Sequence, residues 1–461
     1  PTATAGEAGA VPVTPVQSVC NLPEFAPDAR RLNMTIFVFA WRRLTSLQRL
    51  VSSLQNAEYC GHKLPLTISI DGGASLEVED YVRNLQWVHG EKRLVLYTQM
   101  GLSLGIRGMW LNASSPSVPD YQHVLPLEDD IEVSPLFYWW LLRASRLYDT
   151  SSAATARAAA AAAAAGGVDA GDGPAPPGLY FADGRRLMWR DRLVGISLYT
   201  PRLNEIQYPQ VKWTPDLATD SPTFLLQIPC SWGGLFFGSV WKEFIAFYHE
   251  RVRPPFFDFA QEAAQRGIGK DREPLGDACL RLPASRSNVW PRSWKRFMID
   301  FMYARGLTML YPNLARQRSF STTYMERGGH SGKDGVVEEL SSLSVRKDVD
   351  PLKTVPMVVP AELDEVVVRF DQLPRLETLP AFDIHHTRRP REVLVAQGFA
   401  FTENVRWWGA RKEATQLGDA AQYAQLATVW SGVGVGVGGG SAGVGGDTGA
   451  GTGAGAGAGA G

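Results

Sequence analysis

Short apolar segments alternate with amphipathic helical segments over the first third of the chain, and this alternation restricts the fold more than any other feature. The apolar segments are rich in β-branched and aromatic residues, which is the composition of buried strands. The predicted strands are residues 34–39, 66–70, 94–97 and 123–127, and the predicted helices are residues 44–54, 75–85 and 105–111. Strands and helices that alternate through short connections form a parallel sheet with right-handed crossovers. The sequence therefore predicts an α/β fold.

Three adjacent carboxylates, Glu128, Asp129 and Asp130, follow the fourth predicted strand. Like charges at this spacing repel one another and raise one another's pKa unless a positive group lies among them. A divalent cation removes that cost, and oxygen ligands suit Mg²⁺ or Mn²⁺. The ends of strands are also where an α/β sheet holds its ligand. A solvated acidic turn is the alternative interpretation, but the preceding strands and helices favour a ligand site.

These elements resemble the nucleotide-binding half of nucleotide-sugar glycosyltransferases of the GT-A fold. The stretch 127–137 is similar to the Glu-Asp-Asp stretch of N-acetylglucosaminyltransferase I-type enzymes. Residues 195–199, 231–237 and 293–313 resemble blocks of a plant and algal group of family 2-like glycosyltransferases. The resemblance covers roughly residues 33–330. It implies a Rossmann-like, mixed and mostly parallel central sheet flanked by helices.

The resemblance also implies roles for individual residues. Asp130 would be the direct metal ligand of a DXD-type motif, and Glu128 and Asp129 would reach the ribose and the sugar of the donor. The metal, Mn²⁺ or Mg²⁺, would bridge the donor diphosphate and neutralise charge on the leaving nucleotide. The other residues expected to bind the donor are Phe39, Asp71, Arg107, Trp232, Gly233 and Gly234. Turn formation is the alternative role of Asp71, and exposure on the surface is the alternative for Arg107.

The catalytic base is harder to assign. The related enzymes carry an acidic pair after a tryptophan late in the domain, whereas a Lys-Arg pair follows Trp294 here. Asp300, further along the same predicted helix, and Asp277 are the candidate bases for an inverting transfer. An ion pair between Asp300 and Arg296 is the competing explanation for Asp300. His330, in a Gly-rich segment, is a candidate second metal ligand.

Low-complexity sequence divides the 461 residues. The predicted parts are a disordered stretch at 1–28, a GT-A domain at 29–335 with a low-complexity insert at 151–177, an appended segment at 336–430 and a disordered Gly-rich tail at 431–461. The disordered parts are poor in residues that can bury apolar surface. The appended segment contains strand-like runs at 357–359 and 366–370, and we expect it to pack on the core.

Composition restricts partners and location. A formal net charge of −1 and the lack of a basic stripe argue against nucleic acid. The four cysteines, at positions 20, 60, 230 and 279, have no metal-site spacing, so they form one or two disulfides in an oxidising lumen or remain thiols. No apolar run reaches the roughly 18–20 residues of a spanning helix. By analogy with the family, we expect a Golgi type II membrane protein whose anchor lies outside this chain.

The expected function is metal-dependent transfer of a hexosyl or N-acetylhexosaminyl group from a UDP-sugar to a glycan or glycoprotein acceptor. A nucleotidyltransferase is one alternative, since it can share this scaffold. That class usually carries a Gly-rich phosphate loop after the first strand, whereas Trp41-Arg42-Arg43 supplies charge without glycine. A non-catalytic GT-A-fold binding protein is the other alternative, because the acidic pair near Trp294 is missing.

Overall fold

The computed structural model describes part of the first of two compact units, Pro1–Val405. The described residues are 18–29, 31–101, 103–113, 122–149, 193–207, 209, 211–215, 221–251, 282, 284–290, 293–324 and 356–402. The insert at 151–177 and the tail at 431–461 lie outside them.

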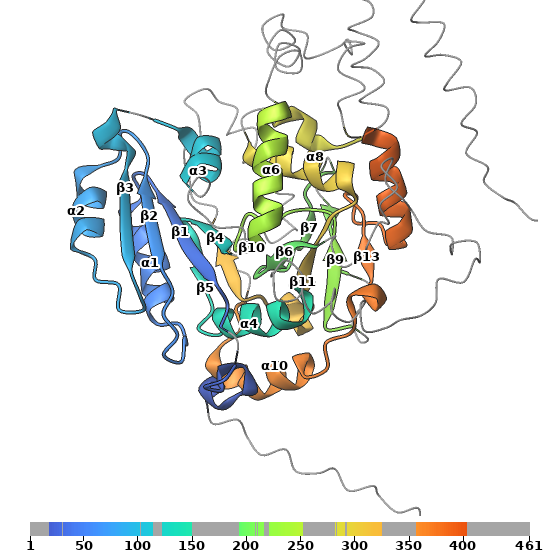
Figure 1. Ribbon diagram of the computed structural model, residues 1–461, viewed down its shortest axis with the longest axis horizontal. Coiled ribbons are helices and arrows are strands. Elements are labelled where there is room, and N and C mark those ends of the chain that lie inside the picture. Colours follow the sequence, from blue (N-terminus) through green and yellow to red (C-terminus); the bar gives the residue numbers. More distant parts are fainter. Residues whose placement is uncertain are drawn as a thin grey trace, which may run out of the picture. The chain divides into compact units, whose positions relative to one another are not determined.

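A nine-stranded sheet forms the centre of the described unit (Figure 1). Its strands are β1 (Met34–Ala40), β2 (Leu66–Ile70), β3 (Lys92–Leu96), β4 (His123–Glu128), β6 (Leu193–Ser197), β9 (Thr223–Leu226), β10 (Gly234–Phe236), β11 (Thr308–Pro312) and β13 (Ala381–Phe382). They lie in the order β13-β9-β11-β6-β10-β4-β1-β2-β3. Two small ladders accompany the sheet, β5 (Ile131–Val133) with β12 (Ser321–Thr323) and β7 (Leu203–Asn204) with β8 (Val211–Lys212).

Helices connect and cover these strands. The α-helices are α1 (Leu44–Gln55), α2 (Leu76–Asn84), α3 (Gly105–Ala113), α4 (Phe137–Tyr148), α6 (Gly238–Arg251), α8 (Trp294–Arg305), α10 (Leu363–Phe370) and a further helix over 391–402. The 3₁₀ helices are η1 (Val19–Asn21), η2 (Pro23–Phe25), η3 (Tyr97–Met100), η6 (Arg286–Val289), η7 (Ala315–Gln317), η8 (Pro360–Glu362) and η9 (Leu376–Thr378). None of the helices in the described part of the chain is long and apolar enough to cross a bilayer.

The strand directions confirm the predicted sheet. Strands β1 to β4 are parallel and adjacent in the order β4-β1-β2-β3. Strand β10 is antiparallel to both β4 and β6, so β6 runs in the same direction as β4, and β11 is parallel to β6. Strands β9 and β13 run the opposite way. The sheet is therefore mixed and mostly parallel, and the carboxyl ends of β1, β2, β4 and β6 share one edge.

Both faces of the sheet are covered by helices. In β1, Ile36 and Val38 belong to a core shared with α1, α4 and α10, whereas Phe37 and Phe39 belong to a second core shared with α3, α6 and α8. Figure 1 shows α3, α6 and α8 together on one side of the sheet and α4 and α10 on the other. Burial on both faces explains why these strands are continuous apolar runs rather than alternating ones.

The predicted strand-like run at 366–370 is wrong, since these residues belong to helix α10. Leu363, Val366 and Phe370 are buried at helical spacing, while Val368 is 62% exposed. The run of valines has β propensity, but the amphipathic period and an acidic first turn favour the helix here.

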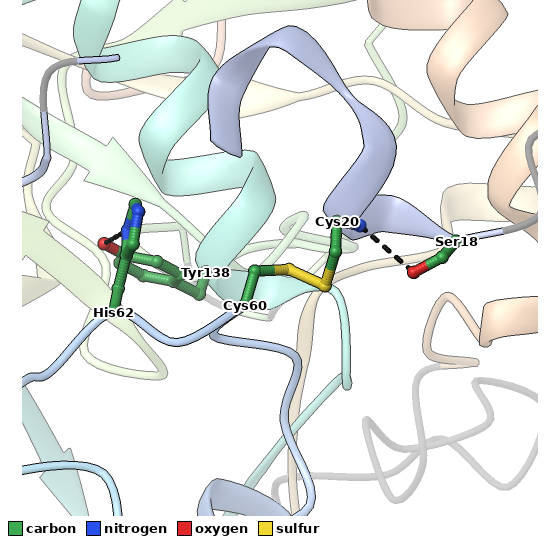
Figure 2. Close-up of a disulfide and its surroundings, with 5 residues drawn as sticks. All are labelled: Ser18, Cys20, Cys60, His62 and Tyr138. Atoms are coloured by element: carbon green, nitrogen blue, oxygen red, sulfur yellow. Dashed lines mark hydrogen bonds between the residues drawn. A yellow bond between two sulfur atoms is a disulfide. The ribbon is translucent and has the colours of Figure 1, made fainter. Parts of the chain in front are cut away.

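The predicted disordered stretch does not extend to residue 28, because residues 18–28 are ordered. Val19 and Phe25 are buried in the core. Figure 2 shows the disulfide between Cys20 and Cys60, which holds this segment to the loop before β2. Composition alone missed this order because a disulfide and two buried side chains compensate for a Pro- and Ala-rich sequence.

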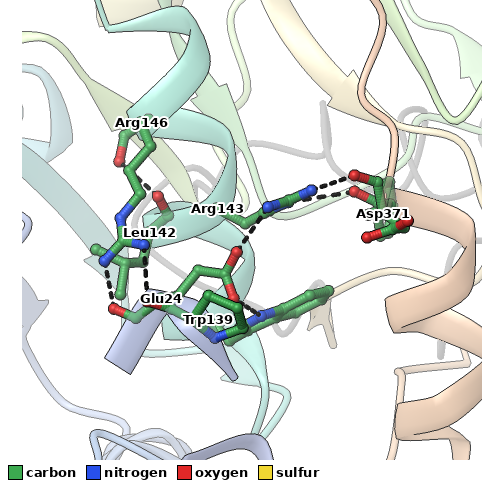
Figure 3. A network of polar contacts seen from close by, with 9 residues as sticks. Glu24, Trp139, Leu142, Arg143, Arg146 and Asp371 are labelled. Atoms are coloured by element: carbon green, nitrogen blue, oxygen red, sulfur yellow. Dashed lines mark hydrogen bonds and ion pairs between the residues drawn. The ribbon is translucent and has the colours of Figure 1, made fainter. Parts of the chain in front are cut away.

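A buried polar network also fastens the N-terminal segment (Figure 3). Glu24 is 3% exposed and accepts a hydrogen bond from Arg143 Nη1 at 2.8 Å. The same guanidinium donates through Nε to the Phe370 carbonyl at 3.2 Å and through Nη2 to the Asp371 carbonyl. Arg143 therefore joins the N-terminal segment, α4 and the end of α10, where the helix dipole favours a cation.

Candidate functional site at the carboxyl edge of the sheet

Several predicted site residues meet at the carboxyl edge of the sheet. Phe39 in β1 pairs with Glu128 in β4, so the residues that follow these two strands are neighbours. Strand β10 is antiparallel to β4, with Phe236 opposite Val124. The segment just before β10, which contains Trp232, therefore precedes a strand that lies next to β4 in the sheet. The topology thus brings together residues far apart in the sequence.

The acidic turn after β4 already contains a positive group. Asp129 and Asp130 are 4% and 7% exposed, and both form ion pairs with Arg43, which precedes α1. Arg43 Nη1 lies 3.1 Å from Asp130 Oδ2, and Nη2 donates to Asp129. Burial lowers the pKa of Arg43, but the hydrogen bond to Asp129 and the surrounding carboxylates raise it overall.

Glu128 has a different environment from the two aspartates. Its Oε1 accepts a hydrogen bond from Trp110 Nε1 at 3.1 Å. Burial raises the pKa of the Glu128 carboxyl to about 8, and the charge of Asp130 adds to this effect, while the Trp110 hydrogen bond opposes it. The carboxyl group therefore holds a proton in much of the population at neutral pH.

The aspartates of the acidic turn pair with a guanidinium in this structure. Among the residues that the structure describes, Cys20, Glu58 and Cys60 are the one group of three potential ligands with converging atoms, and its cysteines form the disulfide. Asp129 and Asp130 face Arg43 instead. A cation at this turn would have to displace the guanidinium. His330, the predicted second ligand, lies outside the described residues.

The segment before β10 is tied to the small ladder of β5 and β12, which follows the acidic turn. Ser321 Oγ donates to the Trp232 carbonyl at 2.6 Å, and Ser321 begins β12, which pairs with β5 directly after the turn. Gly233 has φ +99°, and a Cβ there would lie 3.0 Å from Ser321 Oγ; a Cβ on Gly234 would lie 2.6 Å from the Cys230 carbonyl. Both glycines are thus required by the close approach of these segments. Trp232 remains partly exposed.

Asp71 and Arg107 have partners within the fold. The Asp71 carboxylate accepts hydrogen bonds from the amides of Leu104 at 2.7 Å and Gly105 at 2.9 Å, so it caps the start of α3. The Arg107 guanidinium lies 5.9 Å from the ring centre of Phe297 in α8. These contacts explain both residues without a ligand, and their donor-binding roles remain predictions.

Two tryptophans connect the acidic turn to α8. Trp110 stacks on Trp294 with ring centres 3.7 Å apart and an interplanar angle of 14°. Phe39, which is 4% exposed, packs against Trp110 at 5.6 Å. Lys295, next to Trp294, donates to Glu205 Oε1 at 2.6 Å. Trp110 and Glu205 were not predicted as site residues, because neither lies in a recognisable motif.

The candidate bases remain untested. Asp300 is 1% exposed, in the middle of α8, where a bound acceptor has no direct access in this conformation. Asp277 lies outside the described residues. The resemblance placed an acidic pair after the tryptophan, and the structure instead brings one carboxylate, that of Glu205, to Lys295 from another part of the chain.

The sequence matches no protein-family model and no curated protein. Among solved structures, the chain is similar to the crystal structure of S. aureus TarS 1-349 at 10% sequence identity. The match covers 85% of this chain and 93% of that chain, with a TM-score of 0.28. We draw no functional conclusion from a similarity of this size.

Proposed function

We propose that the protein is a GT-A-type glycosyltransferase that binds a UDP-sugar at the carboxyl edge of its sheet and transfers the sugar to a glycan or glycoprotein. The observation that carries this proposal is the acidic turn at the end of β4, which lies at the shared edge of parallel strands. Ligands of open α/β sheets bind at such edges. The partly exposed Trp232 precedes β10, the neighbour of β4 in the sheet, and an aromatic ring suits a sugar.

Each group at the edge has a chemical role in this proposal. The carboxylate oxygens of Asp129 and Asp130 can accept hydrogen bonds from ribose and sugar hydroxyls, while protonated Glu128 can also donate one. Arg43 pairs with both aspartates, and a guanidinium suits the oxygens of a diphosphate. A divalent cation would compete with Arg43 for the two aspartates. Inverting stereochemistry remains part of the proposal.

The disulfide supports a secretory location. Cys20 and Cys60 are bonded, and disulfides persist in oxidising compartments and are rare in the cytosol. We therefore propose a Golgi or other secretory-pathway lumen. The location can be tested in cells that express the protein. Labelling with a membrane-impermeant thiol reagent and digestion with a protease are each carried out with and without detergent, and a lumenal protein is protected until detergent is added.

Isothermal titration calorimetry of UDP and ATP into the full chain tests the function. We expect UDP to bind more tightly than ATP, and Asp130→Asn to weaken UDP binding at least tenfold. Asp80→Asn, in the exposed part of α2, is the control and leaves binding unchanged. Repeating the titrations in Mn²⁺ and in EDTA measures any dependence on the cation. No heat with UDP, from protein shown to be folded, would contradict the proposal, and tighter binding of ATP would favour a nucleotidyltransferase.

A non-catalytic binding protein is the second candidate. The ion pairs of Arg43 with both aspartates favour it, because they neutralise the acidic turn without a cofactor. Release of UDP from UDP-sugars separates the candidates, since a binding protein retains UDP affinity and releases none.

A further inference from the structure

A largely buried ion pair lies beside Trp232. Lys295 Nζ donates to Glu205 Oε1 at 2.6 Å, and the side chains are 8% and 20% exposed. The same ammonium lies 5.6 Å from the centre of the Trp232 ring, at the range of a cation–π contact. Desolvation of both ions offsets much of the attraction within such a pair, so stability alone is a poor explanation for it.

Tyr199 adds a polar group in need of a partner. It is 1% exposed, and its ring packs against Trp232 with centres 4.8 Å apart. Within the described part of the chain, its hydroxyl has no hydrogen-bond partner. Burial raises the pKa of Tyr199, the charge of Arg202 lowers it, and Cys230 and Glu205 raise it. A buried hydroxyl without a partner points to a bound water.

This cluster adjoins the proposed donor site. Trp294, the neighbour of Lys295, stacks on Trp110, and Trp110 donates to Glu128 of the acidic turn. The Trp232 carbonyl accepts a hydrogen bond from Ser321, which pairs with Val133 in β5, the strand after the turn. A molecule bound at the cluster would therefore lie next to a donor bound at the turn.

The chemistry of the cluster suits an uncharged saccharide better than an anion. Glu205 cancels the charge of Lys295, which leaves little attraction for phosphate. Saccharide hydroxyls both donate and accept, so one sugar can donate to Glu205 and accept from Lys295. The apolar face of a sugar ring packs on an aromatic side chain such as Trp232.

We propose that Glu205, Lys295 and Trp232 form a saccharide-binding subsite that receives the acceptor sugar, with Tyr199 packed behind Trp232. Glu205 accepts a hydrogen bond from a hydroxyl of that sugar. The assignment of this saccharide as the acceptor rests on the proposed glycosyl transfer. The carboxylate that pairs with Lys295 comes from the segment after β7 rather than from α8.

Saturation-transfer NMR tests the subsite with methyl glycosides of common hexoses and N-acetylhexosamines, with and without UDP. We expect wild-type protein to bind at least one of these probes, and Glu205→Gln and Trp232→Ala each to weaken that binding at least tenfold. Glu243→Gln is the matched control, because Glu243 also pairs with a cation of α8 (Arg305, at 3.9 Å) but is exposed. Circular dichroism and melting temperature establish that each variant is folded.

The double variant Glu205→Gln/Lys295→Met separates a binding role from a structural one. If Glu205 serves only to neutralise Lys295, removing both charges restores probe binding, and the proposal is overturned. Loss of binding in both the single and the double variant supports it. Absence of probe binding by wild type, or unchanged binding in Glu205→Gln, also overturns it.

The titration of UDP into the same proteins distinguishes the two proposals. Unchanged UDP affinity in Glu205→Gln, with probe binding lost, supports a subsite separate from the donor site. Wild-type protein that binds the probe through Glu205 but fails to bind UDP would retain the saccharide subsite and overturn glycosyl transfer.

Discussion

Replacing Arg43 with methionine is expected to destabilise the protein and to open the acidic turn to a cation. The substitution leaves Asp129 and Asp130, 4% and 7% exposed, without the guanidinium that pairs with both. Removing one partner of a buried ion pair costs about 3–5 kcal/mol, because the remaining charge is buried and uncompensated. The Arg43 side chain is 21% exposed, so water reaches part of the site and the lower end, about 3 kcal/mol, applies.

Urea denaturation followed by tryptophan fluorescence measures this loss at pH 7. Arg83→Met is the control, since Arg83 is 42% exposed and lies 3.5 Å from Glu79 in the same helix. Such surface pairs contribute at most about 0.5 kcal/mol. Adding Mn²⁺ should then raise the free energy of unfolding of Arg43→Met, by about 2.7 kcal/mol at a Mn²⁺ concentration 100 times its Kd. Wild-type protein should gain less, because Arg43 competes for the same carboxylates.

Two results would refute this reasoning. A loss below about 1 kcal/mol in Arg43→Met would mean that solvent or another side chain compensates the aspartates. Equal stabilisation of the wild type and the variant by Mn²⁺ would show that the cation binds without displacing Arg43.

Three further predictions concern stability. Reducing the disulfide between Cys20 and Cys60, which are 40 residues apart, should lower the free energy of unfolding by about 4 kcal/mol, because the unfolded chain gains loop entropy. Dithiothreitol should therefore lower the urea midpoint of wild type and leave that of the Cys20→Ser/Cys60→Ser variant unchanged. Gly233→Ala should lower stability by about 1–3 kcal/mol, because φ is +99° and the new Cβ lies 3.0 Å from Ser321 Oγ; a melting temperature equal to that of wild type would contradict the backbone argument. Burial lowers the pKa of His386 from 6.5 to about 3, with Lys295 contributing, so the unfolded state binds more protons between these values. Stability should therefore fall as pH drops below about 6.5, by up to about 1.4 kcal/mol per pH unit, and His386→Asn should flatten the curve.

The parallel unit was predictable because its signal is local. Each strand from β1 to β4 is a short apolar run and each intervening helix has its own period, so order and direction follow from short connections. The prediction at 366–370 was wrong because a run of β-branched residues can be a strand or one turn of a helix, and only the pattern of burial distinguishes the two. Val368 is exposed, as the helix requires. The order of residues 18–28 depends on the pairing of Cys20, which spacing does not specify.

The contents of the site were harder to predict because they depend on which strands are neighbours. The basic residues after β1 and the acidic turn after β4 are both visible in the sequence, but their pairing requires β4 to lie beside β1, as Phe39 opposite Glu128 shows. With that adjacency known, Arg43 becomes the nearest counter-charge for Asp129 and Asp130. A cation was expected at this turn because like charges need compensation, and a guanidinium from the neighbouring loop meets the same electrostatic requirement. An acidic motif at a strand end therefore predicts a positive partner. The neighbouring loops determine whether that partner is a basic side chain, a metal ion, or a side chain that a metal ion can displace.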